Sequence, residues 1–177
     1  KIENQNGYLF YTYEEINYLF AYTGKDKDLR LPQSYNGKKY QIYKYAFYDC
    51  KKLYELGIPE TVVTLDDGAI AGCKNLGLLK IKNRSTLNIG DSAVNTTMPT
   101  QVILDVTAVP TISSVSFRLG NEHKIYIPKN LESAFKANTN WVKLNLVPCE
   151  SFDTFTVKVN VNVEVLNVPI IANIGEV

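Results

Sequence analysis

The chain has 177 residues, with 19 basic and 18 acidic side chains and a formal net charge of +1. This length allows one domain or two small ones with a substantial core, and the balanced charge gives no reason to expect nucleic acid or an anionic membrane as the partner. The longest apolar runs are only a few residues, which excludes a transmembrane helix.

The first part of the chain is rich in tyrosine and favours a β-hairpin. Of the 12 tyrosines, 11 lie within the first 54 residues. Residues 7–23 are mainly aromatic and apolar, with a polar break at Glu14 and Glu15, as is typical of two strands joined by a tight connection. We expect residues 1–28 to form an N-terminal β cap that covers the open end of the following core. The alternative is an aromatic surface on which a ligand stacks.

A repeated pattern predicts a solenoid over residues 29–146. Seven positions between Ile42 and Ile58 recur 23 residues later, between Leu65 and Ile81. Short segments with two apolar residues around an outward one have the period of half-buried strands, and we expect them to stack into one parallel sheet. The five predicted rungs are Leu29-Arg30-Leu31, Leu56-Gly57-Ile58, Leu79-Lys80-Ile81, Leu104-Asp105-Val106 and Ile125-Tyr126-Ile127.

The rest of each predicted coil carries a small residue followed by a large one. The pairs are Ala46-Phe47, Ala69-Ile70, Ala93-Val94 and Ser116-Phe117. A small residue at a fixed place in every coil predicts close approach of the backbone there. The large neighbours are expected to stack between coils.

The unit Ile-x-x-Tyr-Ala-Phe-x-x-Cys-x-x-Leu-x-x-Leu-x-Ile-Pro-x-x-Val runs from Ile42 to Val62 and returns less completely from Leu65 to Ile81, while residues 84–124 depart from it. This unit resembles the BspA-like leucine-rich repeat of bacterial surface proteins. The segment from residue 125 to 141 resembles the last repeat of that family, in which a strand leads to a short helix closed by Trp. The resemblance implies a right-handed, mainly β solenoid, an extracellular or cell-surface location, and a role in binding rather than catalysis.

Residues 129–141 are expected to form the C-terminal cap of the solenoid. Leu131 and Phe135 have helical spacing, and Ala134 and Ala137 are good helix formers, so we predict a helix of about three turns. Trp141 is expected to fold back as its apolar anchor.

Residues 147–177 are expected to be a trailing β segment. Residues 154–168 alternate with period 2, with Phe155, Val157, Val159, Val161, Val163 and Val165 on one side. This pattern predicts one strand with an apolar face, which needs a partner. We expect it to begin a second β-module whose remaining strands include residues 170–177, and to pair along the solenoid, with a neighbouring copy of the chain in a homo-oligomer, or with a further domain.

No group of residues predicts an active site. His123 is the one histidine, and no nucleophile is positioned for it. The adjacent carboxylates Glu14-Glu15 and Asp66-Asp67 would point to opposite faces of an extended segment, which does not suit a glycosidase. There is no Gly-rich phosphate loop. We therefore expect a protein that is not an enzyme and uses no cofactor.

The three cysteines are not expected to bind metal or to form disulfides. Cys50, Cys73 and Cys149 lack the short spacing of a zinc site. Cys50 and Cys73 occupy equivalent positions in successive repeats, where parallel side chains are poorly oriented for the disulfide torsion. We expect both to be buried thiols that act as small hydrophobes.

One cluster of lysines and tyrosines is the candidate binding surface, consisting of Lys38, Lys39, Tyr40, Tyr43, Lys44, Tyr48, Lys51 and Lys52. Positive charge together with aromatic rings suits an acidic glycan or polymer. The alternative is a solvated face from which several tyrosines point inward.

From the sequence we predict an extracellular binding or adhesion module that recognises a host protein or glycan through an extended surface, with no nucleic acid partner and no membrane insertion. The alternatives are an accessory carbohydrate-binding part of a larger surface enzyme and a structural spacer.

Overall fold

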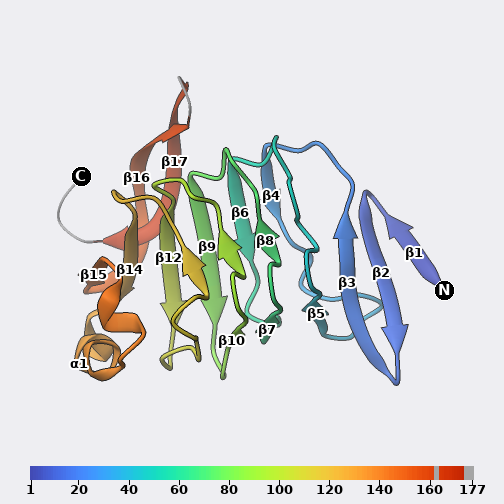
Figure 1. The fold of residues 1–177 in the computed structure, drawn as a ribbon, viewed down its shortest axis with the longest axis horizontal. Helices are drawn as coiled ribbons and strands as arrows, with labels where there is room; N and C mark the ends of the chain where they lie inside the picture. The colour runs from blue at the N-terminus through green and yellow to red at the C-terminus, as the bar shows by residue number, and fades with distance from the viewer. Residues whose placement is uncertain (162–163, 174–177) are drawn as a thin grey trace.

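The computed structural model describes residues 1–161 and 164–173, and its main feature is a β-solenoid with one continuous core (Figure 1). Three sheets of the solenoid surround this core, and a separate two-stranded sheet follows them. The fold is mainly β with one short α-helix near the C-terminal end of the stack, as the sequence predicts.

The N-terminal hairpin is confirmed and forms part of the first sheet. Strands β1 (Ile2–Gln5), β2 (Tyr8–Tyr13) and β3 (Ile16–Tyr22) are antiparallel, and the two residues between β2 and β3 have positive φ angles of 46° and 64°, as in a tight hairpin turn. Beyond β3 the same sheet continues with the short strands β5 (Tyr40–Ile42), β7 (Thr64–Leu65) and β10 (Asn88–Ile89), all parallel. The hairpin therefore extends the first sheet and covers the end of the core.

The second sheet contains the predicted rungs. Its strands are β4 (Asp28–Arg30), β6 (Glu55–Ile58), β9 (Leu78–Asn83), β12 (Gln101–Val106), β14 (Lys124–Pro128) and β15 (Leu146–Cys149). Neighbouring strands in this sheet are all parallel. The apolar residues directly opposite one another are Leu29, Leu56, Leu79, Val102, Ile125 and Leu146.

Two features of this sheet differ from the sequence prediction. Leu79 pairs with Val102 and not with Leu104, so the predicted register of the fourth rung is wrong by two residues. The 23-residue spacing continues through position 102, and a shift of two keeps the same side of the strand facing the core. The sheet also has a sixth rung, β15, that was not among the five predicted. The division of the chain into domains at residues 28/29 and 146/147 remains a prediction.

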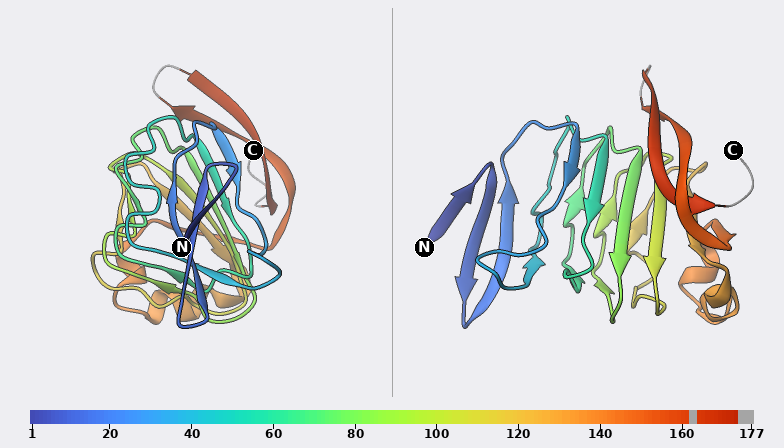
Figure 2. Two further views of the ribbon diagram at one scale, coloured as in Figure 1. Left: turned by 90° about the vertical axis from the view of Figure 1, so that its right-hand side faces the viewer. Right: turned by 180° about the vertical axis from the view of Figure 1, so that it is seen from behind.

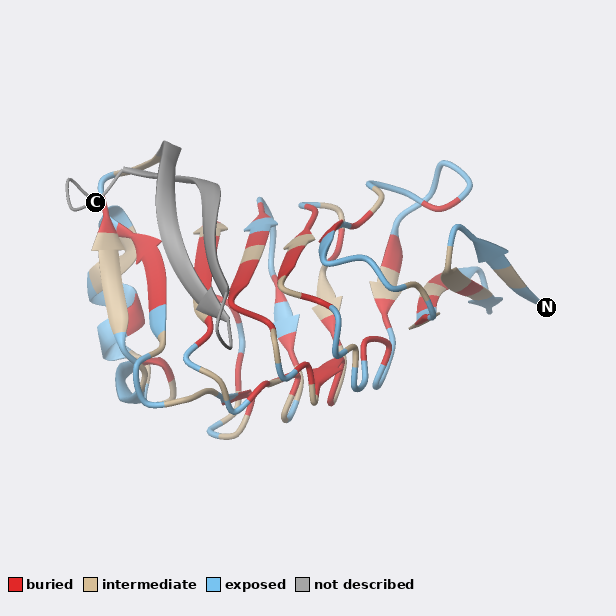
Figure 3. Ribbon diagram, turned by 90° about the horizontal axis from the view of Figure 1, so that it is seen from above, coloured by how far each residue is buried: buried red, intermediate tan, exposed pale blue. Residues whose placement is uncertain are grey.

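The third sheet is built from the small-then-large pairs. Strands β8 (Ile70–Ala71), β11 (Val94–Asn95) and β13 (Phe117–Arg118) place Ile70, Val94 and Phe117 directly opposite one another. The small residues before them are fully buried, as the sequence predicts, and each accepts a backbone hydrogen bond from the large residue of the preceding coil, for example Ile70 N–H to the Ala93 carbonyl at 2.7 Å. Figure 3 shows how buried residues recur along the stacked coils.

The C-terminal cap is shorter than the predicted helix over residues 129–141. It consists of a 3₁₀ turn η1 (Lys129–Leu131), helix α1 (Glu132–Ala137) and a second 3₁₀ turn η2 (Trp141–Lys143). The helix ends because Asn138 is extended and its side-chain oxygen accepts the backbone N–H groups of Asn140 and Trp141. Trp141 is fully buried against Phe135, with 5.0 Å between the ring centroids, so its role as an anchor is confirmed.

The trailing segment forms an antiparallel pair, β16 (Ser151–Val161) and β17 (Glu164–Asn173) (Figure 2). The prediction of one continuous strand over residues 154–168 is wrong, because two strands share this range. Their pairing supplies a partner within the same chain. The apolar face predicted from Phe155 to Val165 depends on side chains that lie outside the described part of the structure. Residues 162–163 and 174–177 lie outside it entirely.

Candidate binding surface

The most distinctive surface of the described structure is a group of five aromatic side chains on the N-terminal hairpin, which we call the aromatic patch. It consists of Tyr11 and Tyr13 from β2, Tyr18 and Phe20 from β3, and Tyr43, which follows β5. These five side chains line a shallow cavity of about 290 Å³. The patch corresponds to the ligand-stacking surface that the sequence left open as an alternative to a simple cap.

Strand alternation explains why these rings face solvent. Phe10 and Leu19 are directly opposite each other and point into the core, where their side chains are buried. Tyr11 and Tyr18 form the next cross-strand pair and therefore lie on the other face. The register skips Phe20, the extra residue of a β-bulge in β3, and its side chain is exposed.

The rings of the patch contact one another in two orientations. The Tyr43 ring centroid lies 5.7 Å from that of Phe20 with an interplanar angle of 23°, and 5.6 Å from that of Tyr18 at 75°. Tyr13, Phe20 and Tyr43 remain 55%, 40% and 37% exposed. The patch therefore combines a nearly parallel pair with an edge-on ring, and large ring surfaces remain open to solvent.

A second layer of aromatic side chains supports the patch from inside. Phe10 stacks on Tyr35 with 4.3 Å between the ring centroids and meets Tyr40 edge to face at 5.3 Å. The Tyr35 hydroxyl donates to a Glu3 carboxylate oxygen at 2.5 Å, which raises the pKa of Tyr35. The Tyr40 hydroxyl donates to the Pro32 carbonyl at 2.6 Å, and burial raises the pKa of Tyr40. These contacts fix the strands that carry the exposed rings.

The structure does not bring the eight residues of the predicted lysine and tyrosine cluster into one surface. Tyr40 is only 2% exposed, so its assignment to a binding surface is wrong, because it points inward with Ile42 of the same strand. Tyr43 belongs to the aromatic patch, whereas Tyr48 is 63% exposed and forms an edge-to-face pair with Tyr45. The five lysines, Lys38, Lys39, Lys44, Lys51 and Lys52, are all exposed.

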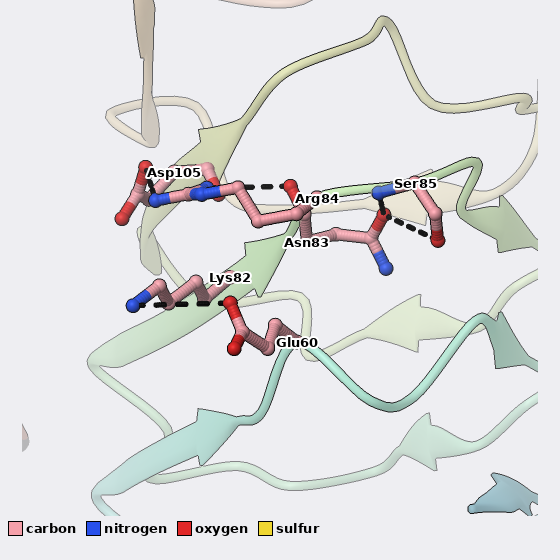
Figure 4. A network of polar contacts seen from close by, with 6 residues as sticks. All are labelled: Glu60, Lys82, Asn83, Arg84, Ser85 and Asp105. Atoms are coloured by element: carbon pink, nitrogen blue, oxygen red, sulfur yellow. Dashed lines mark hydrogen bonds and ion pairs between the residues drawn. The ribbon is translucent and has the colours of Figure 1, made fainter.

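A groove of about 300 Å³ on the outer face of the second sheet is the other notable hollow, and several of its charged side chains take part in ion pairs. Gly57 has no side chain to fill the groove that it lines. Lys80 Nζ lies 2.5 Å from a carboxylate oxygen of buried Glu55. Arg84 pairs with Asp105 at 2.9 Å (Figure 4). In these ion pairs the opposite charges neutralise one another, whereas the aromatic patch is lined by uncharged rings that are open to solvent.

His123 has a structural role in linking two loops. His123 Nδ1 lies 2.8 Å from the Gly120 carbonyl, and its Nε2 accepts the Asn145 backbone N–H at 3.1 Å, which ties together the loops before β14 and β15. Within residues 1–152, whose side chains the structure describes, no group of three or more His, Cys, Asp or Glu is suited to hold a metal. In the same part of the chain no helix has the length and apolar character needed to cross a membrane.

The cysteines are free thiols, and one of them is less buried than expected. Cys73 is fully buried and donates to the Phe47 carbonyl at 3.0 Å, whereas Cys50 is half-buried, so the prediction that both are buried is wrong for Cys50. The interaction between the two side chains lowers the pKa of Cys50 and, together with burial, raises that of Cys73. Burial raises the pKa of Cys149 to about 12.

Comparison with known proteins agrees with the repeat architecture. The sequence profile of a family described as "BspA type Leucine rich repeat region" matches residues 40–158 in 6 copies. No curated protein matches the chain. A solved structure of a leucine rich cell surface protein from Faecalibacterium prausnitzii A2-165 is similar at 18% sequence identity and a TM-score of 0.46, covering 71% of this chain and 45% of that one. The chain therefore spans less than half the length of that protein.

Proposed function

The chain belongs to the BspA-type leucine-rich repeat family, and we propose that it is a non-enzymatic binding module that recognises a macromolecular partner outside the bacterial cell or on its surface. Solenoids of stacked repeats fill their interior with side chains and typically bind through their surfaces. The continuous buried core of this chain is consistent with that use. We take the partner to be a host protein or a glycan.

The aromatic patch is the observation that carries this proposal. Contiguous apolar surface that stays open on a folded chain marks interaction sites, and tyrosine is enriched among the residues that dominate binding energy. Three rings of the patch are more than one-third exposed, whereas the alternate positions on the same two strands, such as Phe10 and Leu19, point into the core and are buried. Covering the end of the core requires only the inward face of the hairpin, so the cap role does not explain the outward rings.

The proposal can be tested by screening the 177-residue chain against immobilised host extracellular proteins and glycans. The patch variant Tyr13→Ser/Tyr43→Ser changes exposed rings outside the core, and the control Tyr45→Ser/Tyr48→Ser changes two tyrosines outside the patch that are more exposed still. We expect at least one saturable partner whose affinity falls at least tenfold in the patch variant and stays within twofold of wild type in the control. Absence of any partner would instead favour the structural spacer.

The exposed lysines support a second candidate, an acidic polymer. Among the described ion pairs only Lys51 of this group takes part, with Asp49 at 3.4 Å. Binding of this kind weakens steeply with ionic strength. Charge reversal at Lys38 and Lys39 should remove such binding, whereas the patch variant should not.

A further inference from the structure

We infer that the aromatic patch is a carbohydrate site that takes a neutral sugar chain, with a sugar ring lying against Phe20 and Tyr43 and its hydroxyl groups meeting the phenols around them. This inference rests on the proposed binding function and names the ligand class of the same surface. Three properties of the patch support it: its charge, its size and its rigidity.

The uncharged lining of the patch disfavours acidic and purely aliphatic ligands. All five side chains that line the cavity are neutral, and four of them carry a phenolic hydroxyl. An acidic ligand would find no cation in this lining, and a purely aliphatic side chain would bury phenols without giving them hydrogen-bond partners. A neutral sugar has C–H faces that match aromatic rings and a rim of hydroxyl groups that match phenols. Its chemistry is therefore complementary to the whole lining.

The size of the patch favours a small chemical group over a folded protein. The cavity of about 290 Å³ lies at the lower end of the range for small-molecule sites. A stable protein–protein interface uses about 20–30 residues on each side, several times more than the five rings of the patch. Exposed Ile16 lies directly opposite Tyr13 and adds to this surface, which ends at the exposed and charged turn residues Glu14 and Glu15. The patch therefore fits a sugar unit better than the centre of a protein interface.

The rigidity of the patch reduces the entropic cost of binding. Tyr11 and Tyr18 are direct cross-strand partners, and Tyr43 is held against Tyr18 and Phe20 by ring contacts. The supporting layer around Phe10 fixes the strands beneath them. Rigid aromatic side chains lose little conformational freedom on binding, which is why tyrosine serves so well in recognition surfaces.

The test is isothermal titration of the 177-residue chain with neutral oligosaccharides, such as gluco- and manno-oligosaccharides, and with polygalacturonate as the acidic counterpart. We expect a neutral oligosaccharide to bind saturably, Phe20→Ala and Tyr43→Ala to weaken it at least tenfold, and Tyr45→Ala to change it less than twofold. Tyr18→Phe, which keeps the ring and removes the hydroxyl, should weaken binding about three- to tenfold, in line with one lost hydrogen bond. Far-UV circular dichroism and melting temperatures confirm that each variant is folded.

The outcomes separate this inference from the proposed function. If no neutral oligosaccharide binds but a protein partner is lost in Phe20→Ala and Tyr43→Ala, the carbohydrate assignment is overturned and the binding function stands. If polygalacturonate binds preferentially and the patch variants leave its affinity unchanged, the carbohydrate site lies on the lysine surface and the inference is again overturned. If neither sugars nor proteins bind, both the inference and the proposed function fail.

Discussion

The indole nitrogen of Trp141 donates a hydrogen bond to the carbonyl oxygen of Pro110 across 2.8 Å, joining the C-terminal cap to a coil 31 residues earlier. The Trp141 ring is fully buried and contacts the rings of Phe135 and Phe117.

Trp141→Ala should therefore lower the free energy of unfolding by about 3–5 kcal/mol. Trp141→Phe keeps much of the packing but leaves the carbonyl unpaired, and should cost about 1–3 kcal/mol. Urea denaturation followed by far-UV circular dichroism measures both. An alanine variant as stable as wild type would show that the cap does not support the stack.

Close approach of consecutive coils makes Gly90 sensitive to any side chain. A Cβ atom at Gly90 would lie 2.8 Å from the Asp67 backbone nitrogen and 3.0 Å from the Asp66 carbonyl carbon, and backbone atoms cannot move aside easily. Gly90→Ala should therefore destabilise the fold by about 1–3 kcal/mol. Gly57→Ala is the matched control, because the nearest atom to a Cβ there is 3.7 Å away and glycine weakens a strand interior. Equal urea midpoints for the two variants would contradict this prediction.

Much of the solenoid could be predicted from spacing alone. The 23-residue period from Leu56 to Leu79 is the distance between directly opposite residues in neighbouring rungs. At the fourth rung the residue pattern and the period disagree: Leu104-Asp105-Val106 resembles the other rungs, but the 23-residue period leads to Val102, which is the residue opposite Leu79. The sixth rung, β15, could not be predicted in this way. Its position depends on how the cap around Trp141 returns the chain to the sheet.

The candidate site was predictable only in part. Period-2 alternation places Tyr40 on the same side of β5 as buried Ile42, so the sequence contained the signal that removes Tyr40 from the surface. The outward position of Phe20 depends on a β-bulge, and alternation alone does not reveal where an extra residue is inserted. The contact of Tyr43 with the hairpin arises from the parallel pairing of β3 with β5, two strands between which the chain passes through β4 of the other sheet. Such a contact has no local sequence signature.

The two repeat cysteines should differ in reactivity. Cys50 is half-buried and its side-chain interaction with Cys73 lowers its pKa, whereas Cys73 is fully buried and its pKa is raised. Because the thiolate is the reactive form, iodoacetamide should modify Cys50 in the folded protein and leave Cys73 and Cys149 protected until urea is added. Mass spectrometry of peptides from the alkylated, unreduced protein measures this order. A disulfide-linked peptide containing Cys50 and Cys73, or equal labelling of both, would refute it.

Glu132, the first residue of helix α1, should make stability depend on pH at the acidic end. Its carboxylate lies 2.7 Å from Lys129 Nζ and 2.5 Å from Lys136 Nζ, and hydrogen bonds to these two ammonium groups lower its pKa from 4.5 to about 2. Since the folded state favours the ionised form, the contribution of Glu132 is complete above pH 4.5 and disappears as the pH falls towards 2. These ion pairs are exposed to solvent, so the contribution is small and decreases with added salt.

Glu132→Gln tests this contribution. Its melting temperature should lie below that of wild type at pH 7, and the difference should close between pH 4.5 and about 2, the interval over which the carboxyl is ionised only in the folded state. Glu122→Gln is the control, because Glu122 is exposed and belongs to none of the ion pairs in the described residues. A gap between wild type and Glu132→Gln that stays constant from pH 7 to pH 2 would mean that the carboxylate charge adds nothing to the cap. The loss of stability in Glu132→Gln would then come from the amide itself and not from the missing charge, and packing around Trp141 and Phe135, not the ion pairs, would hold the end of the solenoid closed.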